Sequence, residues 1–181
     1  RIMSEVIQPT IHGLAADGLR YRGFLYAGIM VTADGTPKVL EYNCRFGDPE
    51  TQPILFRLKS DLLDLIEAAC HGSLGDQIAL WDSRAALGVV MAAPGYPGDY
   101  PKGAAISLGQ DIEDTKVFHA GTAMSGDQPV TSGGRVLCVT ALGSGVTEAQ
   151  AKAYERLKTV QFEGAEYRTD IGYRAVEREN A

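Results

Sequence analysis

One continuous segment, residues 38–52 (KVLEYNCRFGDPETQ), constrains this chain more than any other part of the sequence. Its first half predicts a β-strand, because Val, Leu and Tyr favour strands and an Asp-Gly turn signal lies just upstream. Side chains alternate along a strand, so Glu41, Asn43 and Arg45 are predicted to share one face, each about 7 Å from the next. That face would combine a carboxylate, an amide oxygen and a guanidinium.

Two interpretations of this face follow from its chemistry. A buried charge without a partner is costly, so polar groups in line on an otherwise apolar strand indicate a ligand. Oxygen donors suit Mg²⁺, which is commonly held by one or two protein groups together with phosphates, and Arg45 suits phosphate or carboxylate. The alternative is that Glu41 and Asn43 form the solvated face of an antiparallel sheet, and the pattern alone leaves both open.

The residues that follow carry a resemblance to a known family. Residues 45–52 (RFGDPETQ) resemble the signature of glycinamide ribonucleotide synthetases (phosphoribosylamine–glycine ligases). The pattern Glu41-x-Asn43-x-Arg45 resembles the metal-binding strand of the wider ATP-grasp ligases. Further stretches extend the resemblance over nearly the whole chain, namely residues 21–28, 87–100, 116–122, 133–142 and 170–178.

The resemblance implies a fold class and a division into domains. It implies an α+β fold, in which the end of an ATP-grasp domain (an antiparallel sheet with helices) precedes a small α+β carboxy-terminal domain. The sequence begins with Arg1 and shows no glycine-rich phosphate loop before residue 38. We therefore expect the carboxy-terminal part of a longer enzyme, whose amino-terminal part is the missing partner.

Composition excludes several classes of partner. The 181 residues suffice for one large or two small cores. With 17 basic and 23 acidic residues the net charge is −6, which argues against nucleic acid or an anionic membrane as the main partner. Apolar runs are far shorter than a bilayer span. Three widely spaced cysteines predict buried, reduced thiols in a cytoplasmic protein.

The amino-terminal half is predicted to be helical first and then a hairpin. Residues 1–8 show a helical spacing that ends before Pro9, and residues 14–21 are predicted as a polar connection. The apolar run at residues 24–32 predicts a strand that pairs with the metal strand in an antiparallel hairpin.

A helical run follows the signature, with Thr51 as its predicted N-cap, because an earlier start would place Pro53 inside the helix. Ser60 is a candidate break in this run, which is predicted to present one core face. The polar, poorly periodic residues 72–83 predict a domain boundary. The predicted domains are residues 1–78 and 79–181.

The second domain is predicted to combine short strands with one long helix. The predicted strands cover residues 87–93, 104–108, 116–120 and 136–142. A capping box at residues 147–150 begins the helix. Its buried stripe is expected at Ala149, Ala153, Leu157 and Val160. The charged tail, residues 168–178, is expected to dock through its few apolar side chains.

Two loops of this domain are candidates for binding substrate. Tyr96 lies in a Pro/Gly-rich loop, where it lines a substrate pocket or packs against its own turn. Gly133 and Gly134 let backbone amides approach an anion, and Arg135 adds positive charge. A plain hairpin loop is the alternative interpretation of residues 132–135.

The resemblance also implies an activity. It implies an ATP-dependent ligase that joins glycine to 5-phosphoribosylamine through a glycyl phosphate and yields glycinamide ribonucleotide, ADP and phosphate in purine biosynthesis. It implies Mg²⁺ or Mn²⁺ at Glu41 and Asn43, a catalytic Arg45, and Asp48 or Glu50 near the glycine ammonium. Asp48 and Glu50 could instead hold Arg45 in place.

Two rival functions remain on the sequence. One is another ATP-grasp carboxylate–amine ligase or carboxylase, because such enzymes share the Glu-x-Asn-x-Arg pattern. The other is a folded fragment that binds ligands but catalyses nothing, which would follow from the lack of a nucleotide-gripping segment.

Overall fold

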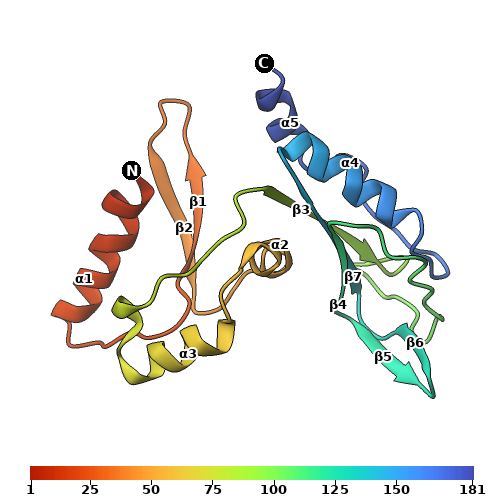
Figure 1. Ribbon diagram of the computed structural model, residues 1–181, viewed down its shortest axis with the longest axis horizontal. Helices are drawn as coiled ribbons and strands as arrows, with labels where there is room; N and C mark the ends of the chain where they lie inside the picture. Colours follow the sequence, from red (N-terminus) through yellow and green to blue (C-terminus); the bar gives the residue numbers. More distant parts are fainter. The chain divides into compact units, whose positions relative to one another are not determined.

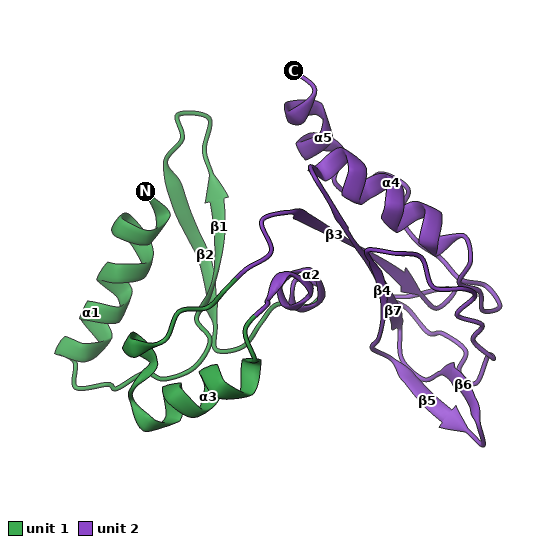
Figure 2. Cartoon of the chain, in the orientation of Figure 1, with its two compact units in different colours: residues 1–48, 60–80 green, residues 49–59, 81–181 purple.

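The computed structural model describes residues 1–181 as helices and antiparallel sheets in two compact units (Figures 1 and 2). The first unit comprises residues 1–48 and 60–80, and the second comprises residues 49–59 and 81–181. The predicted α+β class is confirmed. The predicted domain division after residue 78 stays a prediction; the compact units differ from it mainly by grouping residues 49–59 with the second unit.

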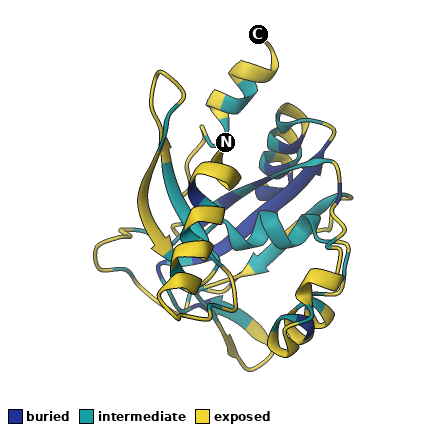
Figure 3. Cartoon of the chain, turned by 90° about the vertical axis from the view of Figure 1, so that its left-hand side faces the viewer, coloured by how far each residue is buried: buried dark blue, intermediate teal, exposed yellow.

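The first unit contains a two-stranded hairpin and three helical segments. The hairpin pairs β1 (Tyr26–Val31) with β2 (Pro37–Asn43) in antiparallel fashion, as predicted. The helical segments are a π-helical turn η1 (Met3–Ile7) that runs into α1 (Gln8–Ala16), α3 (Leu62–His71) and the short η2 (Leu74–Asp76). Most of this unit is exposed, including the helix at the N-terminus (Figure 3).

The predicted end of the first helix before Pro9 is wrong. The helical conformation continues to Ala16, and Pro9 lies in the first turn of α1. Because η1 and α1 are continuous, Pro9 removes one N–H from a running helix, and the hydrogen-bond pattern just before it is π-helical, with the Gln8 N–H donating to the Met3 carbonyl. Part of the predicted connection at residues 14–21 is therefore helical, and the chain turns at Gly18, which has a φ of 78°.

The helical run after the signature is broken at Ser60, as expected. It forms α2 (Thr51–Arg57) and α3, which belong to different units. The single core face predicted for this run is therefore wrong. The predicted cap, Thr51, is itself the first helical residue, so Pro53 falls in the first turn, where its missing N–H costs little.

The second unit is built on a three-stranded antiparallel sheet of order β3-β7-β4, with a separate two-stranded sheet of β5 and β6. Its strands are β3 (Ala85–Ala92), β4 (Thr115–His119), β5 (Thr122–Ser125), β6 (Gln128–Thr131) and β7 (Arg135–Gly143). Two further helices complete the unit, α4 (Val146–Leu157) and α5 (Tyr173–Glu179).

The centre of this unit is β7, which is buried from Val136 onward. Helices α4 and α2 both pack on β3 and β7. Alternate residues of β3, such as Val89, face the main core, whereas Gly88 on the other face lies against Pro53 of α2. A strand covered on both faces is continuously apolar rather than alternating. This explains why β7 is apolar on both faces from Val136 to Leu142, with Thr140 as its one polar residue in that range.

The core joins the inner side chains of β3 and β7 to one stripe of α4. Its members include Val89, Met91, Val139, Ala149 and Leu157, each at most 2% exposed. The stripe predicted for the helix, Ala149, Ala153, Leu157 and Val160, is buried as expected.

The strand predicted at residues 104–108 is wrong. This segment makes isolated bridges through Ala105 and Ser107 and forms no continuous strand. Strands β5 and β6 were not predicted. Residues 132–135 therefore do not close a plain hairpin, since β6 pairs with β5 whereas β7 pairs with β3 and β4. The close backbone approach of Gly121 and Gly133 makes this connection possible, and the Gly133 N–H donates to the Gly121 carbonyl at 2.9 Å.

The predicted capping box at the start of α4 is wrong, because the N-cap residue is Gly145 and no side chain of the box caps the helix. Two carboxylates act around this helix end instead. Glu179 accepts hydrogen bonds from the backbone N–H groups of Val146 (2.8 Å) and Thr147 (2.7 Å). Glu148 accepts from the backbone N–H (2.7 Å) and hydroxyl (2.6 Å) of Ser144. The Ser144 hydroxyl, the Ser144 N–H and the nearby lysine lower the pKa of Glu148 to about 2.

A chain of ion pairs ties the starts of β3, β4 and α4 together. Arg84 contacts Asp82 at 2.9 Å and Asp114 at 2.6 Å, and Lys152 contacts Asp114 at 3.1 Å and Glu148 at 2.9 Å. Asp114 adopts a φ of 60°, which is uncommon for a residue other than glycine. The two cations hold its carboxylate and lower its pKa.

Among residues 1–181, no helix is both long enough and apolar enough to cross a membrane.

The three cysteines are free thiols, but burial was predicted correctly only for Cys138, since Cys44 and Cys70 are exposed.

Candidate metal and substrate site

Two predicted metal ligands lie next to each other on β2. Glu41 and Asn43 share one face of the strand, and the Asn43 amide Nδ2 donates to the Glu41 Oε1 at 3.1 Å. Glu41 is exposed and Asn43 is half-buried, so the cost of burial does not by itself require a ligand here. The hydrogen bond between the two side chains is therefore the observation that supports a ligand site at this position.

The neighbouring strand leaves room for Glu41. Gly28 of β1 lies opposite Glu41, and a Cβ atom at this glycine would come within 3.1 Å of the Glu41 Cγ. The register shifts between Gly28 and Ile29, as in a β-bulge. Gly28 therefore allows close backbone approach, and it lets the Glu41 side chain lie beside Asn43.

These donors fit one kind of metal site. No group of three or more His, Cys, Asp or Glu side chains in residues 1–181 is placed to hold a metal ion. Glu41 and Asn43 supply two hard oxygen donors, which suits a cation such as Mg²⁺ that shares its coordination with phosphates and water. The pair does not suit zinc, which prefers nitrogen and sulfur donors in a closed tetrahedral site.

Arg45 does not share the strand face, contrary to the prediction. Strand β2 ends at Asn43, which pairs with the first residue of β1, and Arg45 lies in the bend that follows. Its Nη1 donates to the Phe46 carbonyl at 3.0 Å. The ring of Phe46 packs on Phe24 with centroids 4.0 Å apart, which holds this bend against the start of the hairpin.

The two acidic candidates lie in different units. Asp48 is exposed at the end of the first unit, and Glu50 is half-buried in the second unit directly before α2. Glu50 is the N-cap residue of α2 but makes no side-chain capping hydrogen bond. Capping therefore does not explain Glu50, and its predicted role at the substrate stays a prediction.

In the second unit, the loop tyrosines pack around Gly134. The Tyr96 ring occupies the space where a Cβ atom at Gly134 would lie, and Tyr100 would be 3.0 Å from that atom. The two rings are 6.2 Å apart between centroids. Packing therefore explains why residue 134 is a glycine and why much of the Tyr96 side chain is covered. The Tyr96 residue remains 36% exposed.

The Gly133 backbone amide is already used within the fold, since it donates to the Gly121 carbonyl. It therefore does not offer a free N–H to an anion, which removes one argument for a phosphate site at Gly133 and Gly134. Arg135 is the half-buried first residue of β7. The substrate-binding roles predicted for Tyr96, Gly133, Gly134 and Arg135 stay predictions.

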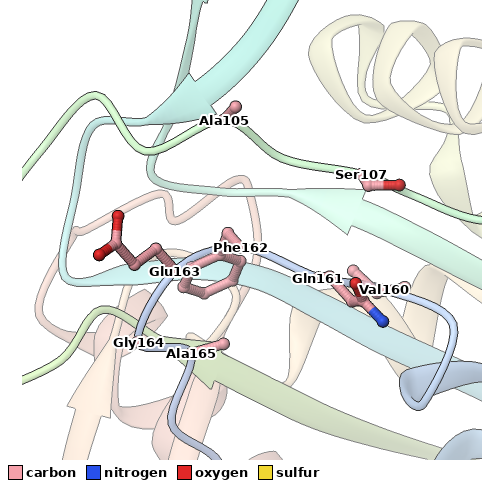
Figure 4. Close-up of a pocket in the computed structure, with 8 residues that line it drawn as sticks. All are labelled: Ala105, Ser107, Val160, Gln161, Phe162, Glu163, Gly164 and Ala165. Carbon is pink, nitrogen blue, oxygen red and sulfur yellow. The ribbon is translucent and has the colours of Figure 1, made fainter.

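A cavity of about 620 Å³ opens elsewhere in the second unit, between residues 105–107 and 160–165 (Figure 4). Its polar side chains are Ser107, Gln161 and Glu163, and Glu163 and Gln161 lie at opposite ends of the lining. None of the predicted site residues lines this cavity. It has no concentrated charge and no paired acid and base.

A basic pocket of about 450 Å³ is formed by residues 168–178 and was not predicted from the sequence. Arg168, Arg174 and Arg178 all line it. The available signal was the occurrence of three arginines within eleven residues of the charged tail.

Comparison with known proteins identifies the family. Residues 1–51 match the family model described as phosphoribosylglycinamide synthetase, ATP-grasp (A) domain, and residues 86–174 match the model described as phosphoribosylglycinamide synthetase, C domain. The two matches follow each other in the order expected from the sequence. The chain belongs to the phosphoribosylglycinamide synthetase family.

Relatives in this family are similar over the whole chain. The phosphoribosylamine–glycine ligase of Vibrio cholerae is 58% identical over 183 residues, and that of Escherichia coli O157:H7 is 57% identical over 182 residues. These alignments cover 100% and 99% of this chain but 43% and 42% of the relatives. The chain therefore spans less than half the length of the curated relatives that it matches.

Solved structures give the same family and a wider fold group. The phosphoribosylamine–glycine ligase of Thermotoga maritima matches 93% of this chain and 42% of its own, with a TM-score of 0.81 and 39% identity. The biotin carboxylase domain of the Hydrogenobacter thermophilus 2-oxoglutarate carboxylase matches 89% of this chain and 36% of its own, with a TM-score of 0.58 and 15% identity. The second likeness shows a shared fold only.

Proposed function

We propose that this chain is the carboxy-terminal part of an ATP-dependent ligase that joins glycine to 5-phosphoribosylamine in purine biosynthesis. Its products would be glycinamide ribonucleotide, ADP and phosphate. The observation that carries the proposal is the Glu41–Asn43 pair on β2 in a chain of the phosphoribosylglycinamide synthetase family. The remaining part of the enzyme, by analogy with the longer relatives, would supply the segment that grips ATP.

The reaction needs ATP because a carboxylate is a poor electrophile. An oxygen of the glycine carboxylate attacks the γ-phosphorus of ATP, the bond to ADP breaks, and glycyl phosphate forms. The ribosylamine nitrogen then attacks the acyl carbon and loses a proton, and phosphate leaves. Both steps require negative charge to be balanced where it accumulates.

Glu41 and Asn43 would hold a divalent cation, Mg²⁺ or Mn²⁺, together with the phosphates of ATP. When bound, such a cation supplies positive charge at the transferring phosphoryl group. The contribution of the chain is to present two oxygen donors side by side, which Gly28 permits by leaving space beside Glu41.

Arg45 would neutralise first the glycine carboxylate and then the acyl phosphate, since a guanidinium binds both groups through paired hydrogen bonds. Its place in a bend rather than on the strand allows it to reach beyond the strand face. Asp48 or Glu50 would receive the glycine ammonium. The sequence and the described geometry offer no obvious general base.

Tyr96, Gly133, Gly134 and Arg135 are proposed to contact the ribosylamine substrate, with Arg135 nearest its phosphate. Replacing Arg135 by Ala should then raise the KM for phosphoribosylamine about tenfold or more and leave the KM for glycine and ATP unchanged. An unchanged KM for phosphoribosylamine would remove Arg135 from the substrate site.

We propose that the reaction takes place in the cytoplasm. We also propose that residues 1–78 form the end of the ATP-grasp domain and that residues 79–181 form the carboxy-terminal domain. The charge of −6 supports small-molecule substrates rather than nucleic acid. The isolated 181-residue chain is expected to be inactive.

The deciding experiment measures ADP release by the complete enzyme with a divalent cation, glycine and fresh phosphoribosylamine, each omitted in turn. Release that requires all components supports the proposal. Release with a different acid or amine would contradict the substrates and keep ATP-dependent ligation. The 181-residue chain is assayed in parallel, and turnover by that chain would contradict its proposed inactivity.

A further inference from the structure

The basic pocket of residues 168–178 lies wholly within the second unit. It is lined by Arg168, Arg174 and Arg178, and Asp170 contributes the carboxylate in its lining. Arg168 and Asp170 already form a paired contact, with Nε–Oδ1 at 2.8 Å and Nη2–Oδ2 at 2.7 Å. Two positive charges are therefore left uncompensated in the pocket of an acidic chain.

The two remaining arginines keep their terminal nitrogens available. Arg174 donates from Nε to the Tyr173 hydroxyl at 2.9 Å, and Arg178 donates from Nε to the Arg174 carbonyl at 3.0 Å. Neither guanidinium forms an ion pair within residues 1–181, although Glu177 lies on the same helix outside the pocket. Four terminal N–H₂ groups therefore remain for a ligand.

The loop that leads into α5, the helix carrying these two arginines, is fixed to the core. The Tyr154 hydroxyl donates to the Arg168 carbonyl at 2.8 Å and accepts from the Ile171 N–H at 3.0 Å. The Gln150 amide donates to the Ile171 carbonyl at 2.7 Å, and the Ile171 side chain packs on the core. These contacts hold the floor of the pocket, so binding would not have to order it first.

The Arg174 guanidinium is oriented as well as charged. It lies 5.5 Å from the centroid of the Tyr173 ring, within the range of a cation–π contact. A guanidinium held in this way loses less freedom on binding than a mobile lysine does, and its planar donors match two oxygens of a phosphate at once.

We propose that this pocket binds the phosphate group of a sugar monophosphate, with Arg174 and Arg178 as its ligands. The cavity of about 450 Å³ exceeds the size of a phosphate ion and accommodates the attached pentose. Under the proposed function, on which this part rests, phosphoribosylamine is one source of this group, and its phosphate would then bind at Arg174 and Arg178 instead of at Arg135. A separate sugar phosphate with the same chemistry is the other source.

The site is tested first by binding to the isotope-labelled 181-residue chain. Ribose 5-phosphate is titrated while backbone amide resonances are followed, with ribose as the uncharged control. We expect shifts at residues 168–178 with ribose 5-phosphate and none there with ribose. Shifts elsewhere without any at residues 168–178, or equal shifts with ribose, would overturn the proposal.

Two charge-matched variants separate a defined site from general attraction. Arg174→Gln/Arg178→Gln should weaken binding at least tenfold, whereas Lys116→Gln/Lys158→Gln, which removes the same charge from exposed positions outside the pocket, should change it less than twofold. Equal weakening by both would overturn the proposal. If the first variant unfolds, Arg174→Lys/Arg178→Lys keeps the charge and should still weaken binding, because the paired donors are lost.

Kinetics of the complete enzyme then identify the source of the phosphate. If Arg174→Gln/Arg178→Gln raises the KM for phosphoribosylamine with little change in kcat, the pocket belongs to the substrate. If this variant leaves that KM unchanged although it weakens the binding of ribose 5-phosphate, the pocket belongs to a separate sugar phosphate. Both results support the site. Failure of the complete enzyme to make ADP would contradict the proposed function and leave the binding result standing.

Discussion

The two units of this chain differ most in how much they bury. The second unit encloses a continuous core between β3, β7 and α4, in which Val89, Val136 and Val139 are fully buried. In the first unit, Val6 and Ala68 are the buried apolar residues, and Leu40 on β2 is 66% exposed. The proposed metal ligands thus lie on the unit with the smaller core.

The difference indicates that the two units contribute in different ways. A two-stranded hairpin is marginally stable without a further layer, whereas three strands covered by helices can hold a fixed shape. The second unit has the features of an independent scaffold. The first unit presents polar groups on a hairpin whose apolar side chains remain largely exposed in this chain.

The largest expected effect concerns the metal pair. Glu41→Gln in the complete enzyme should lower kcat by about 10³-fold or more, because a carboxylate ligand is lost at the point where charge accumulates. The thermal midpoint should change little, since Glu41 is exposed. Glu67→Gln on the exposed surface of α3 is the matched control. Activity near that of the unaltered enzyme would remove Glu41 from the site.

A second prediction compares buried and exposed leucines directly. Leu137→Ala in β7 should destabilise the chain by about 2–5 kcal/mol, because it leaves a cavity in a packed core. Leu40→Ala in β2 should change the free energy of unfolding by less than about 0.5 kcal/mol. Urea unfolding of the 181-residue chain measures both. A similar cost at the two positions would refute the contrast between the units.

A third prediction tests how the tyrosine loop is held. Gly134→Ala should cost about 1–3 kcal/mol, because the new methyl group would collide with the Tyr96 ring. Gly75→Ala, where the added atom meets open space, should be close to neutral. Adding Tyr96→Ala to the first variant should recover part of the loss. Independent, additive effects in this double-mutant cycle would show that the two residues do not interact.

The smallest effect concerns pH. The pKa of Glu148 is lowered to about 2, first by the Ser144 hydroxyl, so its ionised form stabilises the fold above its ordinary pKa near 4.5. This contribution should be lost as pH falls from about 4.5 to 2. Glu148→Gln should flatten the stability profile in that window, whereas Glu155→Gln on the same helix should not. Parallel profiles for the unaltered chain and Glu148→Gln would contradict this role.

The sequence was most informative where local pattern and tertiary packing agree. Strands β1, β2, β3 and β7, the break at Ser60 and the stripe through Ala149, Ala153 and Leu157 were all predicted, because periodicity and turn residues decide them. The juxtaposition of Glu41 and Asn43 was also predicted, since alternation along a strand fixes it.

The errors arose where distant residues decide local structure. The first turn of α4 is satisfied by Glu179, more than thirty residues away, and a local capping box could not reveal it. Arg45 was expected on the strand face, but the length of its partner β1 ends the ladder at Asn43. The two small strands β5 and β6 depend on the close approach of Gly121 and Gly133, which no local pattern encodes.

The contact between Glu179 and the start of α4 has a consequence for synthesis on the ribosome. The amides of Val146 and Thr147 find their acceptor 33 and 32 residues later in the chain. At ordinary elongation rates this interval lasts roughly two to seven seconds. The start of α4 therefore gains this cap only after residue 179 has been added, and slow translation of this interval would prolong the time that the helix spends without it.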